Sequence, residues 1–265
     1  MKIISFRDGL GNQLFQYQLV LYFLRKNPNE KVFGLYKKKW LKAHNGLELF
    51  NYFDVSKPSS TFISRLTAFL LMLFDKCIPV ISRDNRFKPK AILQIGYWQN
   101  KDYWGKIPQK IEFKCLELDE KNKIWYDLLW RNNSFFIHVR RGDYLNPGNE
   151  IYNVCDTVYY NKGIELIKKK FDNPYFFVFS DDIEWTKQNI IANNIFYVDN
   201  NLGKYSYLDM YLMSQCKGGI IANSTFSYWA AILGREKSII IYPNNWKIKA
   251  TGESPNIFLD NWIKI

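Results

Sequence analysis

The chain has 265 residues and a formal net charge of +12, from 37 Lys and Arg residues against 25 Asp and Glu. Hydrophobic residues make up 47% of the sequence, which supports a sizeable core and excludes a disordered, collagen-like or coiled-coil protein. The basic excess predicts an anionic partner, for which nucleic acid, anionic lipid and a phosphorylated small molecule all qualify.

Four cysteines lie far apart without a CxxC pair, which favours buried thiols in a reducing cytoplasm over disulfides or a zinc ribbon. The N-terminal residues contain no apolar segment typical of a secretory signal. The most apolar stretch, Leu66–Phe74, is far shorter than the ~20 residues of a membrane-spanning helix. We expect it to form a core helix, with a helix lying on an anionic membrane surface as the alternative.

The first half of the chain has strand and helix patterns of moderate length, followed by an irregular, aromatic-rich stretch. In chain order it predicts a strand at Lys2–Phe6, a helix at Asn12–Lys26, a strand at Lys31–Leu35, a helix at Phe62–Phe74, a strand at Leu93–Tyr97 and a helix at Asp119–Trp130. Aromatic residues in Trp98–Trp104 suggest a surface on which a sugar stacks.

From Ser134 onward, strands alternate regularly with helices. The predicted strands are Phe135–Arg140, Tyr175–Ser180, Ile195–Val198, Gly219–Ala222 and Ser238–Tyr242, and the predicted helices are Thr157–Phe171, Ile183–Ala192, Tyr205–Cys216 and Phe226–Leu233. This alternation is typical of βαβ units in a parallel sheet, whose ligands bind at the carboxyl ends of the strands. We therefore expect an α/β fold with two domains, 1–133 and 134–265.

The first candidate site is the segment Asp8–Gln13, between the first strand and the first helix. Gly9 and Gly11 let backbone N–H groups approach an anion at a helix N-terminus. The side chains of Asn12 and Gln13 can both donate and accept hydrogen bonds. A tight turn with a capping Asn explains the segment equally well.

The second candidate site is His138–Tyr144, at the end of a predicted strand. His138 and Arg140 share one face of that strand, and the guanidinium groups of Arg140 and Arg141 match the oxygens of a diphosphate. Asp143 either orients an arginine or accepts a proton. The alternative is an Arg–Asp pair at the protein surface.

Two further segments follow predicted strands. In Phe179–Asp182 we expect Asp182 to cap the next helix, while the role of Asp181 stays open. In Asn223–Ser227 the hydroxyl groups can hold a phosphate at a helix start or serve as an ordinary cap. We expect His44 to be solvated.

In this order, the segments Gly9–Tyr17, His138–Tyr144, Phe179–Asp182 and Asn223–Ser227 resemble glycosyltransferase family 11, the α-1,2-fucosyltransferases, in its compact bacterial form. The resemblance spans nearly the whole chain. It implies a GT-B-like architecture, with two Rossmann-like domains and a cleft between them. It also implies GDP-β-L-fucose as the donor and inversion to an α-1,2 linkage without a metal cofactor. The chain has no D-x-D triplet, which agrees with a metal-free mechanism.

The resemblance also implies roles for individual residues. Arg140 would neutralise the β-phosphate as the sugar departs, with His138 beside the donor and Asp143 among the catalytic residues. The remaining donor-binding residues would be Gly11 and Asn12 from the N-terminal, acceptor-side domain, Asn223, Ser224 and Thr225 at the phosphate, and Asp209 at the guanine edge.

Two positions depart from the family pattern. Asp8 stands where a glycine is usual, and Gly218-Gly219 stand where His-Asn is common. The carboxylate of Asp8 either repels the diphosphate or serves the acceptor. The general base stays open among Asp143, Asp8 and Asp156, and a leaving-group oxygen can also take the proton.

We therefore expect an inverting fucosyltransferase that builds a surface glycan in the cytoplasm, on a galactoside-terminated or lipid-linked acceptor. Peripheral contact with the inner face of the cytoplasmic membrane is an additional option. The alternatives are a transferase of the same fold that uses another nucleotide sugar, a relative that has lost turnover, and a basic nucleic-acid-binding protein. No Lys/Arg-rich tract dominates the sequence, so we expect no nucleic-acid partner.

Overall fold

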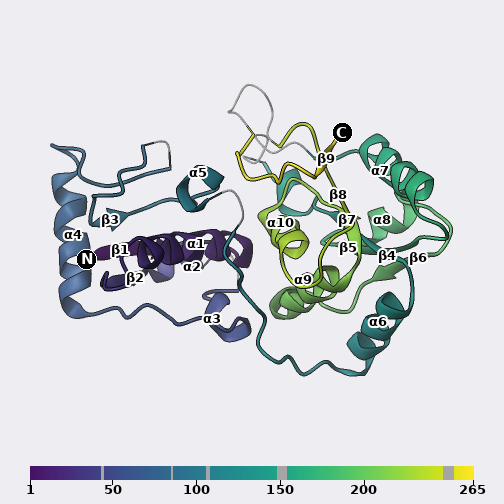
Figure 1. Ribbon diagram of the computed structural model, residues 1–265, viewed down its shortest axis with the longest axis horizontal. Helices are drawn as coiled ribbons and strands as arrows, with labels where there is room; N and C mark the ends of the chain where they lie inside the picture. The colour runs from purple at the N-terminus through teal and green to yellow at the C-terminus, as the bar shows by residue number, and fades with distance from the viewer. Residues whose placement is uncertain (43–44, 85, 106–107, 148–153, 247–253) are drawn as a thin grey trace. The chain divides into compact units, whose positions relative to one another are not determined.

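The computed structural model describes residues 1–42, 45–84, 86–105, 108–147, 154–246 and 254–265, and His44 therefore lies outside the described residues. The chain divides into two compact units, Met1–Lys114 and Cys115–Ile265 (Figure 1), each described by itself below. The sequence places the boundary later, after residue 133. The division comes earlier because helix α6 (Glu120–Arg131) packs against α9 (Ser206–Gln215), where the rings of Tyr126 and Tyr211 stack.

The first unit has a three-stranded parallel sheet in the order β2-β1-β3. Its strands are β1 (Lys2–Phe6), β2 (Val32–Tyr36) and β3 (Leu93–Gln94), and its helices are α1 (Leu10–Lys26), α2 (Lys38–Leu41), α3 (Leu49–Tyr52), α4 (Phe62–Phe74) and α5 (Lys101–Trp104). All five residues of β1 are buried, as expected for a central strand covered on both faces.

Strand β3 is shorter than the predicted strand Leu93–Tyr97. The carboxylate of Asp84 accepts hydrogen bonds from the backbone N–H groups of Tyr97, at 2.7 and 2.9 Å, and of Trp98, at 2.6 Å. These groups are therefore unavailable to a neighbouring strand. Trp98 also has a φ of 62°, which no strand contains.

Helix α4 has the predicted bounds, but it is not the core helix that we expected from the sequence. Of its residues, only Ser64 and Ala68 are buried, while its large apolar side chains are mostly exposed. Ala68 joins Ile3 and Leu93 in a small cluster beneath the sheet. A three-stranded sheet offers too little surface to cover a helix that is apolar on nearly every side.

The second unit has a six-stranded, all-parallel sheet in the order β6-β5-β4-β7-β8-β9. The strands are β4 (Ser134–Val139), β5 (Tyr175–Ser180), β6 (Ile195–Val198), β7 (Gly218–Ile220), β8 (Ile239–Tyr242) and β9 (Ile263–Lys264). Besides α6 and α9, the helices are α7 (Thr157–Lys170), α8 (Ile183–Asn189), α10 (Thr225–Ile232) and the 3₁₀ turns η1 (Asp143–Leu145) and η2 (Gly203–Tyr205).

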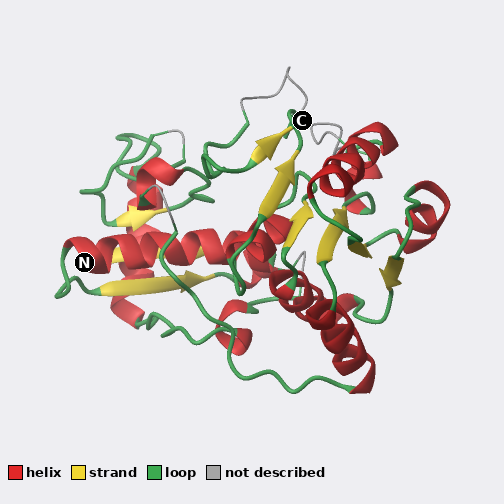
Figure 2. Cartoon of the chain, turned by 45° about the vertical axis from the view of Figure 1, so that its right-hand side comes forward, coloured by secondary structure: helices red, strands yellow, loops and turns green. Residues whose placement is uncertain are grey.

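Helices lie on both faces of this sheet (Figure 2). Successive side chains of β4 point to opposite faces and therefore meet different helices. Ile137 lies in one cluster with Tyr160 and Ile164 of α7. His138, on the other face, packs against Phe226 of α10, with ring centroids 5.7 Å apart. The expected α/β fold is confirmed, and two units with parallel sheets agree with a GT-B-like architecture.

The departure Gly218-Gly219 lies inside strand β7, where both glycines are buried. A Cβ on Gly218 would collide with the backbone carbonyl oxygen of Ile239 in β8, and one on Gly219 would lie 2.5 Å from the ring of Phe136. The two glycines therefore allow large side chains on the neighbouring strands, and they provide no chemistry.

We predict that Gly218→Ala lowers the free energy of unfolding by about 1–3 kcal/mol, because a backbone oxygen cannot move aside without disturbing the sheet. Gly163→Ala in α7 serves as the matched control. Its Cβ meets only the side chain of Ile220, and alanine favours the helix by roughly 1 kcal/mol. Urea unfolding of both variants measures the difference, and equal losses would contradict the prediction.

Candidate functional site

Three neighbouring strands of the second unit deliver polar residues to one edge of the sheet. Strand β4 pairs with β5 on one side and with β7 on the other. Arg140 follows β4, Asp181 follows β5, and Asn223 follows β7 after two more residues. Carboxyl ends of parallel strands are where such sheets bind ligands, so this edge is the candidate site.

The guanidinium group of Arg140 lies between two carboxylates. Its Nη1 is 3.0 Å from Oδ2 of Asp181, and its Nη2 is 2.8 Å from Oδ1 of Asp143. Burial alone would lower the pKa of Arg140, but Asp181 and Asp143 raise it above the ordinary value. The side chain is 29% exposed. Arg140 is thus a fixed, permanent cation with N–H groups left for an anionic ligand.

The two arginines of this segment pair with different carboxylates. Asp143, for which the sequence left open the orienting of an arginine or the acceptance of a proton, binds Arg140. Nε of Arg141 lies 3.2 Å from Oδ2 of Asp182, and the guanidinium stacks 3.9 Å from the ring of Trp185. Asp182 also caps α8, as predicted. Arg141 therefore stabilises the β5–α8 connection.

His138 is buried beneath this edge, with 5% of its surface exposed. Burial, and secondarily the charge of Arg140, lower the pKa of its imidazole to about 3. Among the described residues, its Nδ1 has no hydrogen-bond partner. His138 is therefore a neutral group that can donate or accept one hydrogen bond, and it is a poor proton acceptor.

The turn between β7 and α10 is held by its own polar groups. Asn223 donates from Nδ2 to the carbonyl of Trp246, at 2.9 Å, and its own carbonyl accepts from the hydroxyl of Tyr144, at 2.9 Å. Ser224 caps α10, where its Oγ accepts from the N–H of Phe226. Thr225 is half-buried in the first turn of α10. The ordinary cap is thus confirmed for Ser224, while the helix start still faces the same edge as Arg140.

Asp209 belongs to a separate polar group in the same unit. Its Oδ1 accepts a hydrogen bond from Nδ2 of Asn201, at 2.8 Å, and Asn201 in turn exchanges hydrogen bonds with Asn122. Burial raises the pKa of Asp209 to about 8, against the opposing effect of the bond from Asn201. The carboxyl group is therefore largely protonated at neutral pH.

Asp156, a candidate for the general base, caps helix α7. Its Oδ1 accepts a hydrogen bond from the backbone N–H of Tyr159, at 2.8 Å. This contact gives Asp156 a structural role.

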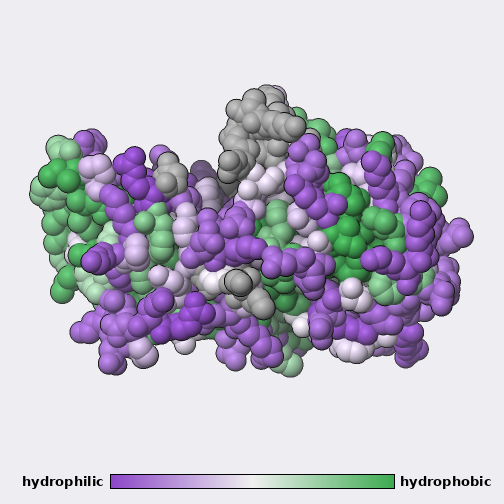
Figure 3. Space-filling model, turned by 45° about the horizontal axis from the view of Figure 1, so that its top comes forward, coloured by the Kyte–Doolittle hydropathy of each residue, from purple (hydrophilic) through white to green (hydrophobic). Residues whose placement is uncertain are grey.

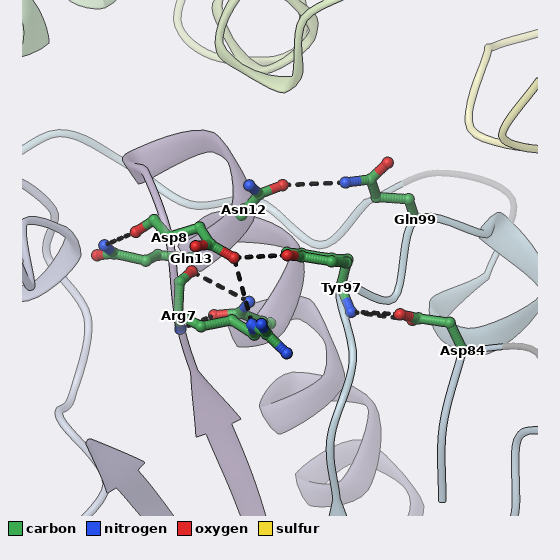
Figure 4. A network of polar contacts seen from close by, with 8 residues as sticks. Arg7, Asp8, Asn12, Gln13, Asp84, Tyr97 and Gln99 are labelled. Carbon is green, nitrogen blue, oxygen red and sulfur yellow. Dashed lines mark hydrogen bonds and ion pairs between the residues drawn. The ribbon is translucent and has the colours of Figure 1, made fainter. Parts of the chain in front are cut away.

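In the first unit, the loop after β1 forms a network of polar contacts (Figure 4). Asp8 has a φ of 59°, a backbone conformation that favours glycine and that Asp tolerates better than most residues. Its Oδ2 accepts from the hydroxyl of Tyr97, at 2.6 Å, and pairs with Nε of Arg7, at 3.2 Å. Asp8 thus stands in the place of the usual glycine in a backbone conformation that is less favourable for Asp, and Arg7 partly balances its negative charge.

Helix α1 begins at Leu10, two residues before the predicted start, so Gly11 and Asn12 lie in its first turn. The backbone N–H groups of Asn12 and Gln13 both point to the carbonyl of Gly9, at 3.0 and 3.1 Å. Oδ1 of Asn12 accepts from Gln99, at 2.9 Å. The amide of Asn12, which is half-exposed, is thus oriented by a neighbour.

The side chain of Gln13 is buried, and its hydrogen bonds are to backbone groups. Its Nε2 donates to the carbonyls of Asp8 and Gly46, both at 2.7 Å. Its Oε1 accepts from the N–H groups of Glu48 and Leu49. Gln13 therefore joins the Asp8 turn to the loop before α3.

The expected sugar-stacking surface at Trp98–Trp104 is wrong for Trp98. Its side chain is fully buried and packs against the rings of Phe87 and Tyr103. The side chain of Trp104 is not among those that the structure describes. Within the described residues, no group of three or more His, Cys, Asp or Glu side chains is arranged to hold a metal ion.

Sequence reasoning missed several residues that position the site. Asp181, left without a role, holds Arg140 and also accepts from the N–H of Arg141, at 2.9 Å. Tyr144 ties the turn after β4 to the β7–α10 turn. The signal available for Asp181 was its place directly after strand β5. No local pattern predicts the contact of Tyr97 with Asp8 or that of Gln99 with Asn12 in the first helix.

Comparisons with known proteins place this arrangement in a family. The model of Glycosyl transferase family 11 matches residues 96–265. The chain is 39% identical to the O-antigen biosynthesis glycosyltransferase WbnK of Escherichia coli, over 97% of this chain and 98% of that protein. It is 31% identical to an α-1,2-colitosyltransferase of Escherichia coli, over 97% and 96% of the two chains. The galactoside 2-α-L-fucosyltransferase Sec1 of Mus musculus is 33% identical over 37% of this chain and 27% of that protein.

The raised pKa of Asp209 predicts a pH-dependent stability. Between its ordinary value near 4 and about 8, the folded protein keeps a proton that the unfolded chain releases, so stability falls as the pH rises through this window. Asp209→Asn can still accept the bond from Asn201 but does not titrate. We expect the Tm difference between Asp209→Asn and the wild type to be more favourable to the variant at pH 8 than at pH 5, by about 2–4 °C or more.

Asp127→Asn is the control, because the side chain of Asp127 is 63% exposed. Thermal unfolding across the pH range measures both differences. A constant gap between Asp209→Asn and the wild type would show that Asp209 is ionised in the folded protein at neutral pH.

Proposed function

Because the chain belongs to glycosyltransferase family 11, we propose that it is an inverting transferase that moves L-fucose from GDP-β-L-fucose to the 2-hydroxyl of a galactoside. The observation that carries this proposal is the fixed guanidinium of Arg140, at the carboxyl ends of three parallel strands and beside the start of α10. The name of the partly matching relative Sec1 supports fucose and a galactoside.

In this proposal Arg140 binds the β-phosphate and stabilises the negative charge that grows there as the bond to the sugar breaks. Asp143 and Asp181 hold the guanidinium before the donor arrives, so little reorganisation is needed when charge develops. In other transferases a divalent metal stabilises the negative charge of the diphosphate, and here the permanent positive charge of Arg140 would do so. We therefore propose that the reaction needs no metal cofactor.

The start of α10 adds donors for the diphosphate. Helix N-termini favour anions, and Asn223, Ser224 and Thr225 lie at this one. His138 is neutral and buried beside Phe226. It would donate a hydrogen bond to the nucleotide sugar, or accept one from it, without adding a charge. Gly11 and Asn12 would contribute from the first unit.

Asp209 is proposed to bind the guanine edge, whose N–H groups need an ionised acceptor. Because burial raises the pKa of this carboxyl to about 8, binding would also include the release of its proton. The bond from Asn201 favours the ionised form and orients the carboxyl.

Of the three carboxylates considered as general base, Asp143 pairs with Arg140 and Asp156 caps a helix. We therefore retain Asp8 as the proposed general base. Its contacts with Tyr97 and Arg7 both use the same carboxylate oxygen, Oδ2. Proton transfer to a leaving-group oxygen remains the alternative. The acceptor in this proposal is a galactoside-terminated glycan or a lipid-linked oligosaccharide.

A second donor is favoured by one specific observation. The relative that is 31% identical along 97% of the chain is named an α-1,2-colitosyltransferase. A nucleotide-linked colitose is therefore the main alternative to GDP-fucose. Membership of a glycosyltransferase family removes the reason to retain the nucleic-acid-binding alternative.

We predict that Arg140→Lys lowers kcat/KM at least ~100-fold. The planar guanidinium can bind two carboxylates and a phosphate at the same time through separate N–H groups, whereas the ammonium group of lysine lacks this geometry. Release of GDP from GDP-fucose, with a panel of β-galactosides, measures the loss. Arg131→Lys on α6 is the control, since that side chain is 81% exposed. Near-wild-type turnover of Arg140→Lys would remove Arg140 from the mechanism.

The donor is tested by thermal stabilisation and turnover with GDP-fucose and GDP-colitose side by side. We expect GDP-fucose to stabilise the protein more and to be consumed faster, with rates unchanged in EDTA. Preference for GDP-colitose would establish the second donor and leave the assignment of Arg140 intact. Loss of turnover in EDTA that Mg²⁺ or Mn²⁺ restores would refute the metal-free mechanism.

A further inference from the structure

Helix α4 of the first unit presents an apolar face to solvent. Figure 3 shows hydrophobic side chains, in green, at the left end of the view, where α4 lies in Figure 1. The residues of this α4 outer face are each 44–72% exposed, and they are Phe62, Ile63, Leu66, Phe69, Leu70, Leu73 and Phe74. Monomeric proteins rarely expose so many neighbouring large apolar residues without a binding role.

The helix itself is well anchored, so the exposure does not reflect a loose segment. Thr61 and Ser64 form a capping box at its N-terminus. Its inner side packs through Ala68 on the sheet cluster. At its end, Asp75 accepts from the N–H of Ile81, at 2.8 Å, and from Arg83, at 2.6 Å. The α4 outer face is therefore held outward by contacts on the opposite side.

Charge around the α4 outer face is predominantly positive. Within the stretch 61–78, which holds α4 and its immediate flanks, the basic residues are Arg65 and Lys76 and the acidic residue is Asp75. Asp75 is already paired with Arg83. Outside this stretch, Nζ of Lys37 lies 3.4 Å from Sδ of Met72 on α4. The patch thus combines aromatic and aliphatic side chains with an excess of cations at its border.

We propose that the α4 outer face docks the protein on an anionic lipid bilayer, with the helix lying in the plane of the membrane interface. Thirteen helical residues extend about 20 Å, less than the ~30 Å hydrocarbon core, so α4 can lie on a membrane but cannot cross it. Apolar side chains bordered by cations are the features that bind such interfacial helices to anionic lipid.

In the described part of the chain, no helix has the length and apolarity needed to span a membrane.

A second copy of the chain is a less suitable occupant. Two such faces packed together would bring Arg65 and Lys76 of one copy close to those of the other, and the neighbouring acidic residue, Asp75, is already paired with Arg83. A bilayer rich in anionic headgroups instead complements these charges. The proposal does not depend on the donor, the acceptor or turnover, so it stands or falls independently of the proposed function.

The test is flotation of the full chain with vesicles of pure phosphatidylcholine and with vesicles containing 30% phosphatidylglycerol. We expect binding to the anionic vesicles, at least tenfold weaker binding to the neutral ones, and weakening by high salt. Leu66→Ser with Phe69→Ser should lower the affinity for anionic vesicles at least tenfold. Arg65→Gln with Lys76→Gln should lower it several-fold and reduce the difference between the two vesicle types.

The matched control is Ile124→Ser with Lys121→Gln on α6, where Ile124 is 64% exposed. It should bind anionic vesicles like the wild type. Circular dichroism and Tm verify that each variant is folded, as expected for substitutions of exposed side chains. Absence of wild-type flotation, equal losses in the control, or undiminished binding of Leu66→Ser with Phe69→Ser would each overturn the proposal. A dimer that these α4 substitutions dissociate, without vesicle binding, would assign the face to a second copy.

Discussion

The second unit is organised around one electrostatic constraint, which is the need to hold the cation of Arg140 at the end of a buried strand. Strand β4 is entirely buried, and Arg140, at its carboxyl end, is the first residue after it that is partly exposed. There Asp143 and Asp181, from two different connections, meet the guanidinium at 2.8 and 3.0 Å. Parallel pairing of β4 with β5 makes this meeting possible, because both strands end at the same level. The arrangement balances part of the charge and leaves the rest for an anion.

Burial determines the protonation of two other groups in the second unit. His138 and Asp209 ionise with opposite charge, yet desolvation favours the neutral form of each, with pKa values of about 3 and about 8. The proposed diphosphate site thus combines the permanent cation of Arg140, held by two carboxylates, with the neutral imidazole of His138. In the proposed reaction, this combination concentrates the electrostatic stabilisation on the leaving phosphate.

The first unit uses polar side chains mainly to shape its backbone. Gln13 bonds four backbone groups, and the carboxylate of Asp84 ends strand β3 and orders the segment that carries Tyr97. Asp8 occupies a left-handed conformation and is held by Tyr97 and Arg7. Helix α4 stands apart from this pattern, since its outer face is neither polar nor covered.

The sequence by itself determined the alternation of strands and helices in the second half, the place of the motifs at strand ends, and the capping role of Asp182. These features depend on local periodicity and on residues within one helical turn, which a single sequence displays. Only the tertiary structure decided that Asp143 binds Arg140, that Asp181 binds the same guanidinium group, and that Trp98 is buried in the core. Each of these depends on contacts between residues far apart in the chain. The same holds for α4, because an apolar pattern predicts a helix but cannot tell whether enough sheet surface exists to cover it.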